Sequence, residues 1–298
     1  MPSLKDIRKR ISSVKNTQKI TRALKLVSAA KLSRAQRDLN RLKPYADKQQ
    51  EMIRDLVAEL GEAPSPLLEA RDEIKRVAVV LISSDRGMCG GFNSNLLKHF
   101  RRYAAEMVKG GAEVVCFPVG KRAIQCVEKE GYTMGASWGE ALAPDLMDRL
   151  PELTRGLVAR FCDEEFDEVV VVSNRFVNAI TQVAATRTML PMGASEGEAK
   201  GDGGSAEQAN GFSDARLYEP DQQTLLDYVL PRALETQMRH VMLESITGEH
   251  AARMNAMNSA TDNASDMINN LTLALNRARQ AAITKELMEI ISGAEALK

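Results

Sequence analysis

The residues best placed to do chemistry form a short glycine-rich loop after an apolar run. The loop Gly87–Gly91 surrounds Cys89 and follows Val77–Ser84 directly. A glycine-rich loop after a strand can cradle a phosphate group with its backbone N–H groups. However, the spacing fits neither G-x-x-x-x-G-K-[ST] nor G-x-G-x-x-G, and the first lysine after the loop is Lys98. A tight strand-to-helix turn or a contact with a partner protein is therefore the favoured interpretation.

Other residue types that commonly carry catalysis are few and poorly spaced. None of the four cysteines forms a C-x-x-C pair, and the three histidines show no zinc-ligand spacing. His240 and His250 lie in a long helical stretch without an evident companion, which favours surface or packing roles. No pair of carboxylates stands out as an acid–base couple. We therefore expect no catalytic residue, cofactor or metal in this chain, and free thiols in a reducing compartment.

Charge is distributed unevenly along the 298 residues. Lysines and arginines number 40, as do aspartates and glutamates, so the formal net charge is zero. Residues 1–43 nevertheless hold 13 basic and two acidic residues, a net charge of +11. Such a segment suits an anionic partner, either nucleic acid or an acidic protein surface, or it forms one solvated helix face. No signal peptide or membrane-spanning run is evident.

The elements expected at the N-terminus are helical. No proline or glycine occurs between Ser3 and Lys43, Pro44 predicts a kink or pause, and a second helix is expected over 47–60. Apolar residues recur in steps of three and four, as in a coiled-coil seam, with one slip after Val14. The expected seam residues are Leu4, Ile7, Ile11, Val14, Ile20, Leu24 and Val27.

The middle of the chain alternates strands and helices. Expected strands lie at 77–84, 113–119, 169–173 and 181–189, and expected helices at 95–109, 121–129 and 146–161. Short apolar runs separated by helices are typical of a mostly parallel, Rossmann-like sheet. Residues 193–211 are rich in Gly, Ser and acidic residues, which predicts a flexible surface loop.

A second long helix is expected over 232–291, where Gly248 is the sole helix breaker. Its predicted seam is Met257, Ala260, Ala264, Met267, Leu271, Ala274, Ala278 and Ala281. The fold class is therefore an antiparallel coiled coil of the two terminal helices with an inserted small α/β domain. The predicted domains are 1–60, 74–220 and 221–298.

Three segments resemble the gamma subunits of F-type ATP synthases. The first contains ISSVKNTQKITRA at 11–23 and AAKL at 29–32. The second is SDRGMCGGFN at 84–93. The third contains AARM at 251–254, ATDNA at 260–264 and NRARQAAITKEL at 276–287. They occur in the family's order and spacing and span the whole predicted architecture.

The resemblance implies a non-catalytic rotor shaft that couples rotation of the membrane c ring to ATP synthesis or hydrolysis on the beta subunits. It implies alpha, beta and epsilon subunits and the c ring as partners, with no nucleic acid. It also implies a peripheral place at the cytoplasmic face of the bacterial inner membrane, reached through the complex. The implied subunit contacts are Arg86, Cys89, Gly90, Arg253, Arg279, Gln280, Thr284, Tyr218 and Glu219.

Two departures from the family pattern are expected to matter little or locally. Gly248 stands in a Thr-Gly-Glu-His run where the family often has Ser-Glu-Gln, and it is expected to loosen the shaft. The 193–211 segment is long for a bacterial-type chain, but it has no cysteine, so the redox-switched dithiol insertion of chloroplast forms is expected to be absent. The rival interpretations are a coiled-coil nucleic-acid binder that uses the basic helix and a nucleotide hydrolase that uses the glycine loop.

Overall fold

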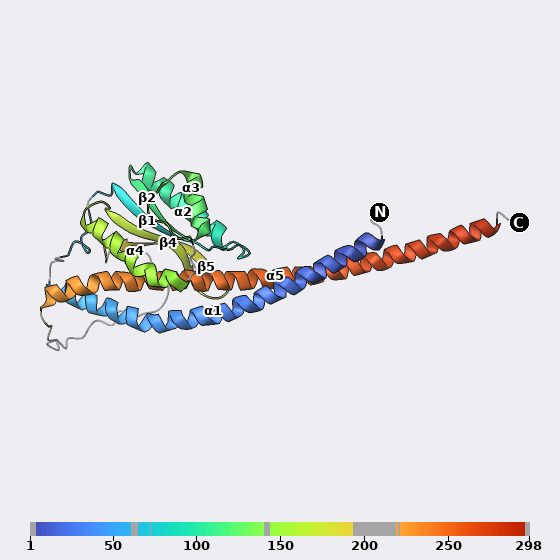
Figure 1. Ribbon diagram of the computed structural model, residues 1–298, viewed down its shortest axis with the longest axis horizontal. Helices are drawn as coiled ribbons and strands as arrows, with labels where there is room; N and C mark the ends of the chain where they lie inside the picture. Colours follow the sequence, from blue (N-terminus) through green and yellow to red (C-terminus); the bar gives the residue numbers. More distant parts are fainter. Residues whose placement is uncertain are drawn as a thin grey trace. The chain divides into compact units, whose positions relative to one another are not determined.

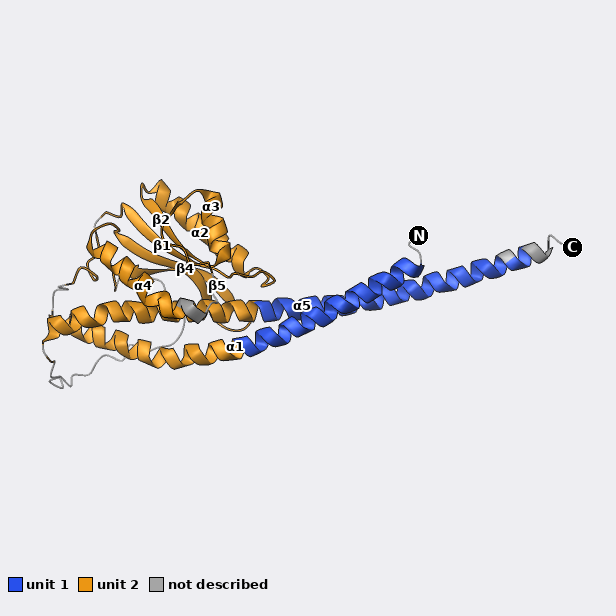
Figure 2. Ribbon diagram, in the orientation of Figure 1, with its two compact units in different colours: residues 1–31, 253–298 blue, residues 32–252 orange. Residues whose placement is uncertain are grey.

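The computed structural model describes residues 4–60, 65–71, 73–139, 144–192, 219 and 221–295. The predicted flexible loop at 193–211 and Tyr218 lie outside these residues. The chain divides into two compact units (Figure 2): unit 1 comprises residues 1–31 and 253–298, and unit 2 comprises residues 32–252. Two long helices, α1 (Leu4–Leu60) and α5 (Gln222–Glu295), run through both units. This division cuts across the helices, so the domain boundaries drawn from the sequence stay a prediction.

Unit 2 is built on a five-stranded sheet in the order β3-β2-β1-β4-β5. The strands are β1 (Arg76–Ile82), β2 (Glu113–Val119), β3 (Thr133–Met134), β4 (Glu168–Phe176) and β5 (Gln182–Leu190). All neighbours are parallel except β4 and β5, which form an antiparallel pair. The predicted mostly parallel sheet is confirmed. The central strand β1 is buried on both faces, and its continuous apolar run reflects that position.

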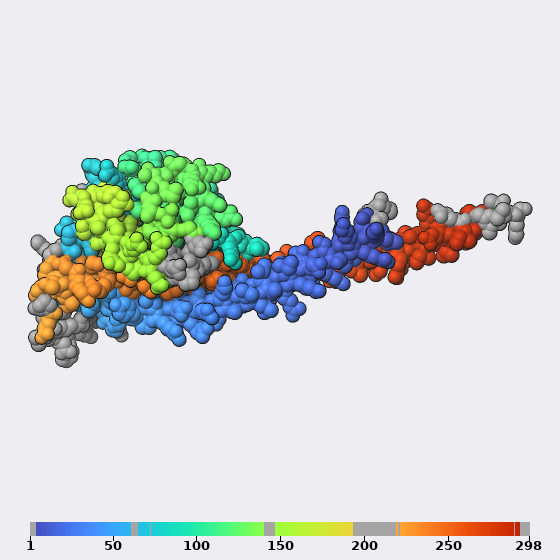
Figure 3. Space-filling view, in the orientation of Figure 1, coloured from blue at the N-terminus to red at the C-terminus, as the bar shows by residue number. Residues whose placement is uncertain are grey.

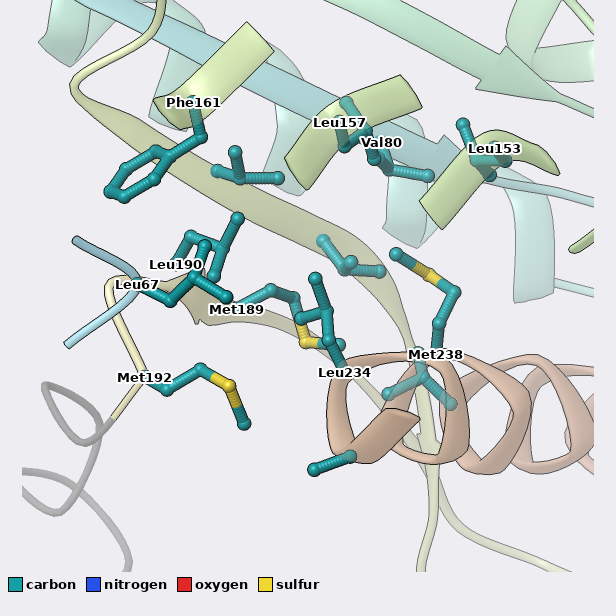
Figure 4. Packing of buried hydrophobic residues seen from close by; sticks show 14 of the residues in the cluster. Leu67, Val80, Leu153, Leu157, Phe161, Met189, Leu190, Met192, Leu234 and Met238 are labelled. Carbon is teal, nitrogen blue, oxygen red and sulfur yellow. The ribbon is translucent and has the colours of Figure 1, made fainter. Parts of the chain in front are cut away.

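Helices cover both faces of the sheet (Figure 1). Leu96 and Phe100 of α2 (Phe92–Lys109) and Val127 of α3 (Lys121–Glu130) pack on one face. On the other face, α4 (Pro144–Cys162) and the unit 2 parts of α1 and α5 enclose a larger core. In a close view of this core, side chains from α4, β1, β5 and α5 converge (Figure 4). In the space-filling view, the atoms of the sheet and its covering helices lie against the unit 2 part of α5 (Figure 3). The strands thus alternate their side chains between two separate apolar cores.

Neither proline of the long helices interrupts them. Pro44 and Pro231 both lie inside continuous helix, so the predicted pause at Pro44 and the predicted separate helix over 47–60 are wrong. Pro44 is exposed, and water can satisfy the carbonyl that loses its helical N–H partner. At the start of α5, the carboxylate of Asp221 accepts hydrogen bonds from the backbone N–H and the hydroxyl of Thr224, both at 2.8 Å. These bonds hold the pKa of Asp221 below its ordinary value.

Gly248 does not loosen α5. The helix is continuous there, and Thr247 and Glu249 on either side are buried. A Cβ atom built at Gly248 would lie 3.3 Å from both Cγ of Gln182 and Cε2 of Phe92. The missing side chain therefore lets β5 and α2 approach the helix closely, and Gly248 is a packing position.

Unit 1 is an antiparallel pair formed by the first part of α1 and the last part of α5. Three hydrogen bonds join the helices: Gln18 Nε2 to Ser265 Oγ at 2.7 Å, Thr261 Oγ1 to Thr21 Oγ1 at 2.8 Å, and Lys25 Nζ to Asn258 Oδ1 at 2.6 Å. Residue numbers rise along one helix as they fall along the other. The predicted antiparallel coiled coil is confirmed.

The seam of α1 differs from the predicted seam. Ile7, Thr21 and Ser28 are buried and Val14 is partly buried, so the contact face recurs every seven residues without a slip. Ile20 and Val27, which were expected in the seam, are 60% and 53% exposed. The sequence pattern followed the apolar side chains, whereas the closely spaced helices accept small polar side chains that bond across the seam.

The seam of α5 is half as predicted. Met257, Ala264, Leu271 and Ala278 face the seam, but the intervening positions are Thr261, Ile268 and Leu275. Met267, Ala274 and Ala281 are exposed instead. From Met257 a heptad seam can continue with a step of three residues, as predicted, or with a step of four, as observed. Small residues occupy both sets of positions, so the sequence does not indicate which set faces the partner helix.

The last part of α5 extends past the end of α1 within unit 1 (Figure 1). Paired residue numbers total about 283 in each of the three hydrogen bonds, which places Leu4 opposite Arg279. Beyond that point the exposed side chains of α5 include Ile283, Leu287, Met288, Ile290 and Ile291, each at least 50% exposed. An apolar helix end of this kind suits burial in another protein.

Candidate subunit-contact surfaces

The loop between β1 and α2 is held by a small polar network. Asn93 Nδ2 donates to Ser84 Oγ at 2.7 Å and to Cys89 Sγ at 3.2 Å, and Asn93 Oδ1 accepts the N–H of Ser84 at 3.2 Å. Ser84 Oγ donates to the carbonyl of Arg86 at 2.8 Å. Met88 and Gly90 have positive φ angles of 61° and 57°, so the chain reverses tightly here. The network fixes the loop as a rigid turn, in agreement with the non-catalytic interpretation of the glycines.

Of the expected contact residues in this loop, two are exposed and one is buried. Arg86 and Gly90 are exposed, as is Met88 at 63%. Cys89 is 2% exposed, and its sulfur is turned into the polar network. The loop can therefore present Arg86, Met88 and Gly90 to a partner, while the Cys89 side chain supports the turn from inside.

The outer face of α1 in unit 1 carries apolar side chains beside cations. Ile20, Leu26 and Val27 are 53–64% exposed, and Lys19 and Arg22 beside them are also exposed. We call Ile20, Leu26 and Val27 the α1 outer face. Reasoning from sequence missed this surface because it placed Ile20 and Val27 in the seam. The heptad of Ile7, Val14, Thr21 and Ser28 was the signal that could have revealed it.

The expected contact residues of α5 are arranged along its exposed surface. Arg279, Gln280 and Thr284 are exposed, and Thr284 Oγ1 donates to the carbonyl of Gln280 at 3.0 Å. Arg253 is partly buried at the start of the unit 1 part of this helix. Glu219 is exposed in unit 2. Of the expected sites that the structure describes, Arg86, Cys89 and Gly90 thus lie in one loop of unit 2, Glu219 lies just before α5, and the other four lie along the unit 1 part of α5.

Thiol chemistry finds little support in the described residues. Burial raises the pKa of the Cys116 thiol to about 12 and also raises the pKa values of Cys126 and Cys162, which keeps these groups protonated. No cluster of three or more His, Cys, Asp or Glu residues that could bind a metal occurs within the described ranges.

One open hollow in unit 2 has a volume of about 350 Å³ and mixes cations with apolar side chains. Its lining residues are Asp38, Arg41, Leu42, Met147, Arg239 and Leu243. This set has a single carboxylate and no thiol, hydroxyl or imidazole, so it does not supply the acid–base pair or nucleophile that catalysis requires.

Known proteins match this chain over its whole length. A family model described as ATP synthase matches residues 3–297. The ATP synthase gamma chain of Chlorobaculum tepidum is 42% identical over 303 aligned residues, and that of Trichlorobacter lovleyi is 43% identical over 298; each alignment covers 100% of both chains. The chain belongs to the ATP synthase gamma chain family. As a gamma chain it is a non-catalytic subunit of ATP synthase, whose catalysis takes place on the beta subunits.

Solved structures show the same fold as this gamma chain. A chain from the central stalk and c-ring structure of the Tetrahymena thermophila mitochondrial ATP synthase aligns with a TM-score of 0.59 at 21% identity, over 81% of this chain and 99% of that one. A chain from the Euglena gracilis mitochondrial enzyme, solved with OSCP, F1 and c-ring, aligns with a TM-score of 0.61 at 19% identity, over 99% and 94%. Within the described part of this gamma chain, no helix combines the length and apolarity needed to cross a bilayer.

Proposed function

We propose that this gamma chain is the central rotor shaft of an F-type ATP synthase. It couples rotation of a membrane c ring to nucleotide chemistry on the beta subunits. The observation that supports the role most directly is the full-length match to gamma chains, combined with a two-helix shaft whose α5 end is apolar and exposed. A helix end of this composition can turn inside a partner bearing without strong ion pairs that would hold one orientation.

We assign the partners by surface. The alpha–beta hexamer surrounds unit 1, which holds Arg253, Arg279, Gln280 and Thr284. The loop with Arg86, Cys89 and Gly90 lies against the acidic lower edge of the hexamer. The epsilon subunit and the c ring bind the unit 2 side, where Tyr218 and Glu219 form part of the foot. The chain is a peripheral subunit at the cytoplasmic face of a bacterial membrane. Its three domains are residues 1–60, 74–220 and 221–298.

The α1 outer face supplies the interface with beta. Three exposed apolar side chains stand next to Lys19 and Arg22, within a segment of net charge +11. Exposed apolar side chains interspersed with cations are complementary to an amphipathic acidic segment, since charges steer the encounter and apolar burial provides affinity. Nucleic-acid binding would use the cations alone and would leave these apolar side chains in water.

The test is co-expression of the chain with alpha and beta subunits, followed by measurement of complex composition and of rotation-linked ATPase activity. We expect a complex with three alpha, three beta and one gamma chain, as the family resemblance implies. A chain that ends after Arg279 should assemble less stably or couple poorly, because it lacks the exposed apolar end of α5.

The full chain with Val108→Ala is the matched control, because Val108 is 52% exposed in unit 2 and is not assigned to the hexamer interface. This variant should assemble and couple like the parent chain. Truncation that left both assembly and coupling unchanged would contradict the bearing role of the α5 end. Failure of the parent chain to assemble with alpha and beta would contradict the rotor role itself.

A further inference from the structure

Three charged or titratable side chains of β5 and α5 meet at a place that the expected contact sites do not include. Glu244 Oε2 lies 3.5 Å from Arg187 Nη2 and 3.7 Å from His240 Nδ1. The side chains of Glu244 and His240 are only 12% and 23% exposed. Arg187 belongs to β5, which is the last strand of the sheet and bonds to β4 alone. One carboxylate oxygen therefore links the edge strand to α5 and is shared with an imidazole.

The spacing of His240 and Glu244 was visible in the sequence. They are four residues apart on one helix, where side chains approach each other, so the expectation that His240 has no companion is wrong. Arg187 and Glu244 are 57 positions apart, and no local pattern indicates such a contact.

The charges around His240 balance when its imidazole is neutral. Glu244 faces it from α5, Arg187 from β5, and Asp47 and Lys43 from α1. Two cations and two carboxylates leave no net charge, so protonation of His240 adds an unbalanced positive charge to a half-buried site. Burial is the largest cause that lowers the pKa of His240, with Arg187 and Lys43 adding to it; Glu244 and Asp47 act in the opposite direction but do not cancel it.

We propose that Arg187, His240 and Glu244 form a proton-sensitive clamp that holds the edge strand β5 on α5 while the imidazole is neutral and loosens when it is protonated. A protonated imidazole competes with Arg187 for Glu244 Oε2 and repels the guanidinium. We call this trio the β5 clamp. It is a property of the chain alone and goes beyond the rotor role, because it makes the attachment of the sheet to the helix depend on pH.

The direction of the pH dependence follows from proton linkage. When β5 opens, His240 regains an ordinary pKa of about 6.5 and binds a proton more readily than in the closed state. The closed state is therefore fully favoured above this value and loses stability as the pH falls through it, until the lower pKa of the closed state is reached. Opening should increase about tenfold for each pH unit between the two pKa values.

Amide hydrogen exchange of the full chain tests the clamp. Rates would be measured at about pH 5.5 and about pH 7.5, on either side of the ordinary histidine value, and corrected for the intrinsic effect of pH. Protection of the β5 amides should fall several-fold at the acidic pH, whereas protection of the central strand β1 should not change. The variant His240→Gln, in which position 240 cannot titrate, should lose most of this pH dependence.

His99→Gln is the matched control. His99 Nε2 lies 3.0 Å from Oγ1 of Thr186, also on β5, and burial is likewise the largest cause that lowers its pKa. Because His99 is not in the clamp but its pKa is also lowered beside β5, this variant should remove only the part of the pH dependence that comes from His99 itself and keep the part that comes from His240. Retention of the dependence in His240→Gln, or its loss in His99→Gln, would overturn the proposal.

Arg187→Gln gives a second measurement that does not depend on the folding of the His240 variant. Removing this cation should raise the pKa of His240, as read from the imidazole resonances by NMR. An unchanged pKa would mean that Arg187 does not act on His240, and the clamp would be wrong.

Discussion

The interiors of the two units are built from different chemistry. In unit 2, aliphatic and aromatic side chains fill two cores on opposite faces of one sheet, and Phe100, Phe161 and Leu226 are completely buried. Within the described part of unit 1, the buried residues are Ile7, Thr21, Ser28, Met257 and Ala264. Unit 1 buries little apolar area, and hydrogen bonds cross its seam.

This difference separates stability from contact with partners. Buried apolar area is the main source of folding free energy, so unit 2 should supply most of the stability of the chain. The narrow pair in unit 1 leaves the greater part of each helix exposed, which provides surface for other subunits. Polar seam residues such as Thr21 favour one register, because a slipped register would break the hydrogen bonds that their hydroxyl groups make across the seam.

The largest expected effect comes from emptying the core of unit 2. Phe161→Ala removes a ring with 0% exposure and should lower the free energy of unfolding by about 3–5 kcal/mol. Met267→Ala in unit 1 removes a side chain that is 53% exposed and should change it by less than about 0.5 kcal/mol. Denaturant titration of the full chains measures both. Similar losses in the two variants would break the comparison between the units.

Added volume in unit 2 should cost nearly as much. Gly120 has a φ of +94°, and a Cβ atom there would lie 2.4 Å from the backbone oxygen of Ser83. Gly120→Ala should therefore destabilise the chain by roughly 2–4 kcal/mol through backbone strain and overpacking. Gly111 has a similar φ of +88° with no atom within 4 Å of its Cβ position. Gly111→Ala should cost only the strain, about 1–2 kcal/mol, and equal losses would show that the space around Gly120 adjusts.

The seam of unit 1 should show a smaller and compensating effect. Thr21→Val or Thr261→Val alone leaves one hydroxyl without its partner across the seam and should cost about 1 kcal/mol. The double variant replaces a polar pair with an apolar pair of the same shape, so its loss should be less than the sum of the single losses.

A double-mutant cycle in the full chain measures this coupling. Thr17→Val is the control for the cycle, because Thr17 Oγ1 bonds to the carbonyl of Ser13 on its own helix and is exposed. It should show no coupling to Thr261→Val. Strict additivity of Thr21→Val and Thr261→Val would mean that the hydrogen bond does not fix the pair.

The sequence predicted unit 2 more accurately than unit 1, and the reason is physical. A strand such as β2 is marked by its own apolar residues, and its expected bounds of 113–119 match the observed Glu113–Val119. In the seam of α1, the side chains that face the partner include Thr21 and Ser28, whereas Ile20 and Val27 face outward. Hydrophobicity alone therefore selects the wrong face when the exposed residues of a helix are more apolar than the residues that face its partner helix.

The candidate sites also differ in whether the sequence could indicate them. The rigid loop at 84–93 was indicated by its glycines and by its position after a strand, and the polar network around Asn93 supports it. The β5 clamp depends on Arg187 and Glu244, which only the folded sheet brings together. Long-range ion pairs of this kind leave no periodic trace in a single sequence.

The smallest effect on stability is expected at the α1 outer face, where the variants distinguish a surface for partner contact from the interior of unit 1. Val27→Ser should change the free energy of unfolding of the free chain by less than about 0.5 kcal/mol, because the side chain is 53% exposed. Assembly can bury only the half of this side chain that the free chain exposes, which contributes about 0.8–1.6 kcal/mol of the roughly 1.5–3 kcal/mol of a fully buried valine, so assembly with alpha and beta should weaken roughly fourfold to tenfold. Val108→Ser on α2 is the matched control, since Val108 is 52% exposed in unit 2 and is not assigned to the hexamer interface.

If both serine variants weakened assembly equally, exposed apolar residues would contribute to assembly equally in both units. If Val27→Ser destabilised the free chain by about 2 kcal/mol, the α1 outer face would belong to the interior of unit 1. If Val27→Ser alone weakened assembly and the stability of the free chain did not change, Val27 would lie on a surface that is exposed to water in the free chain and covered by a partner in the complex.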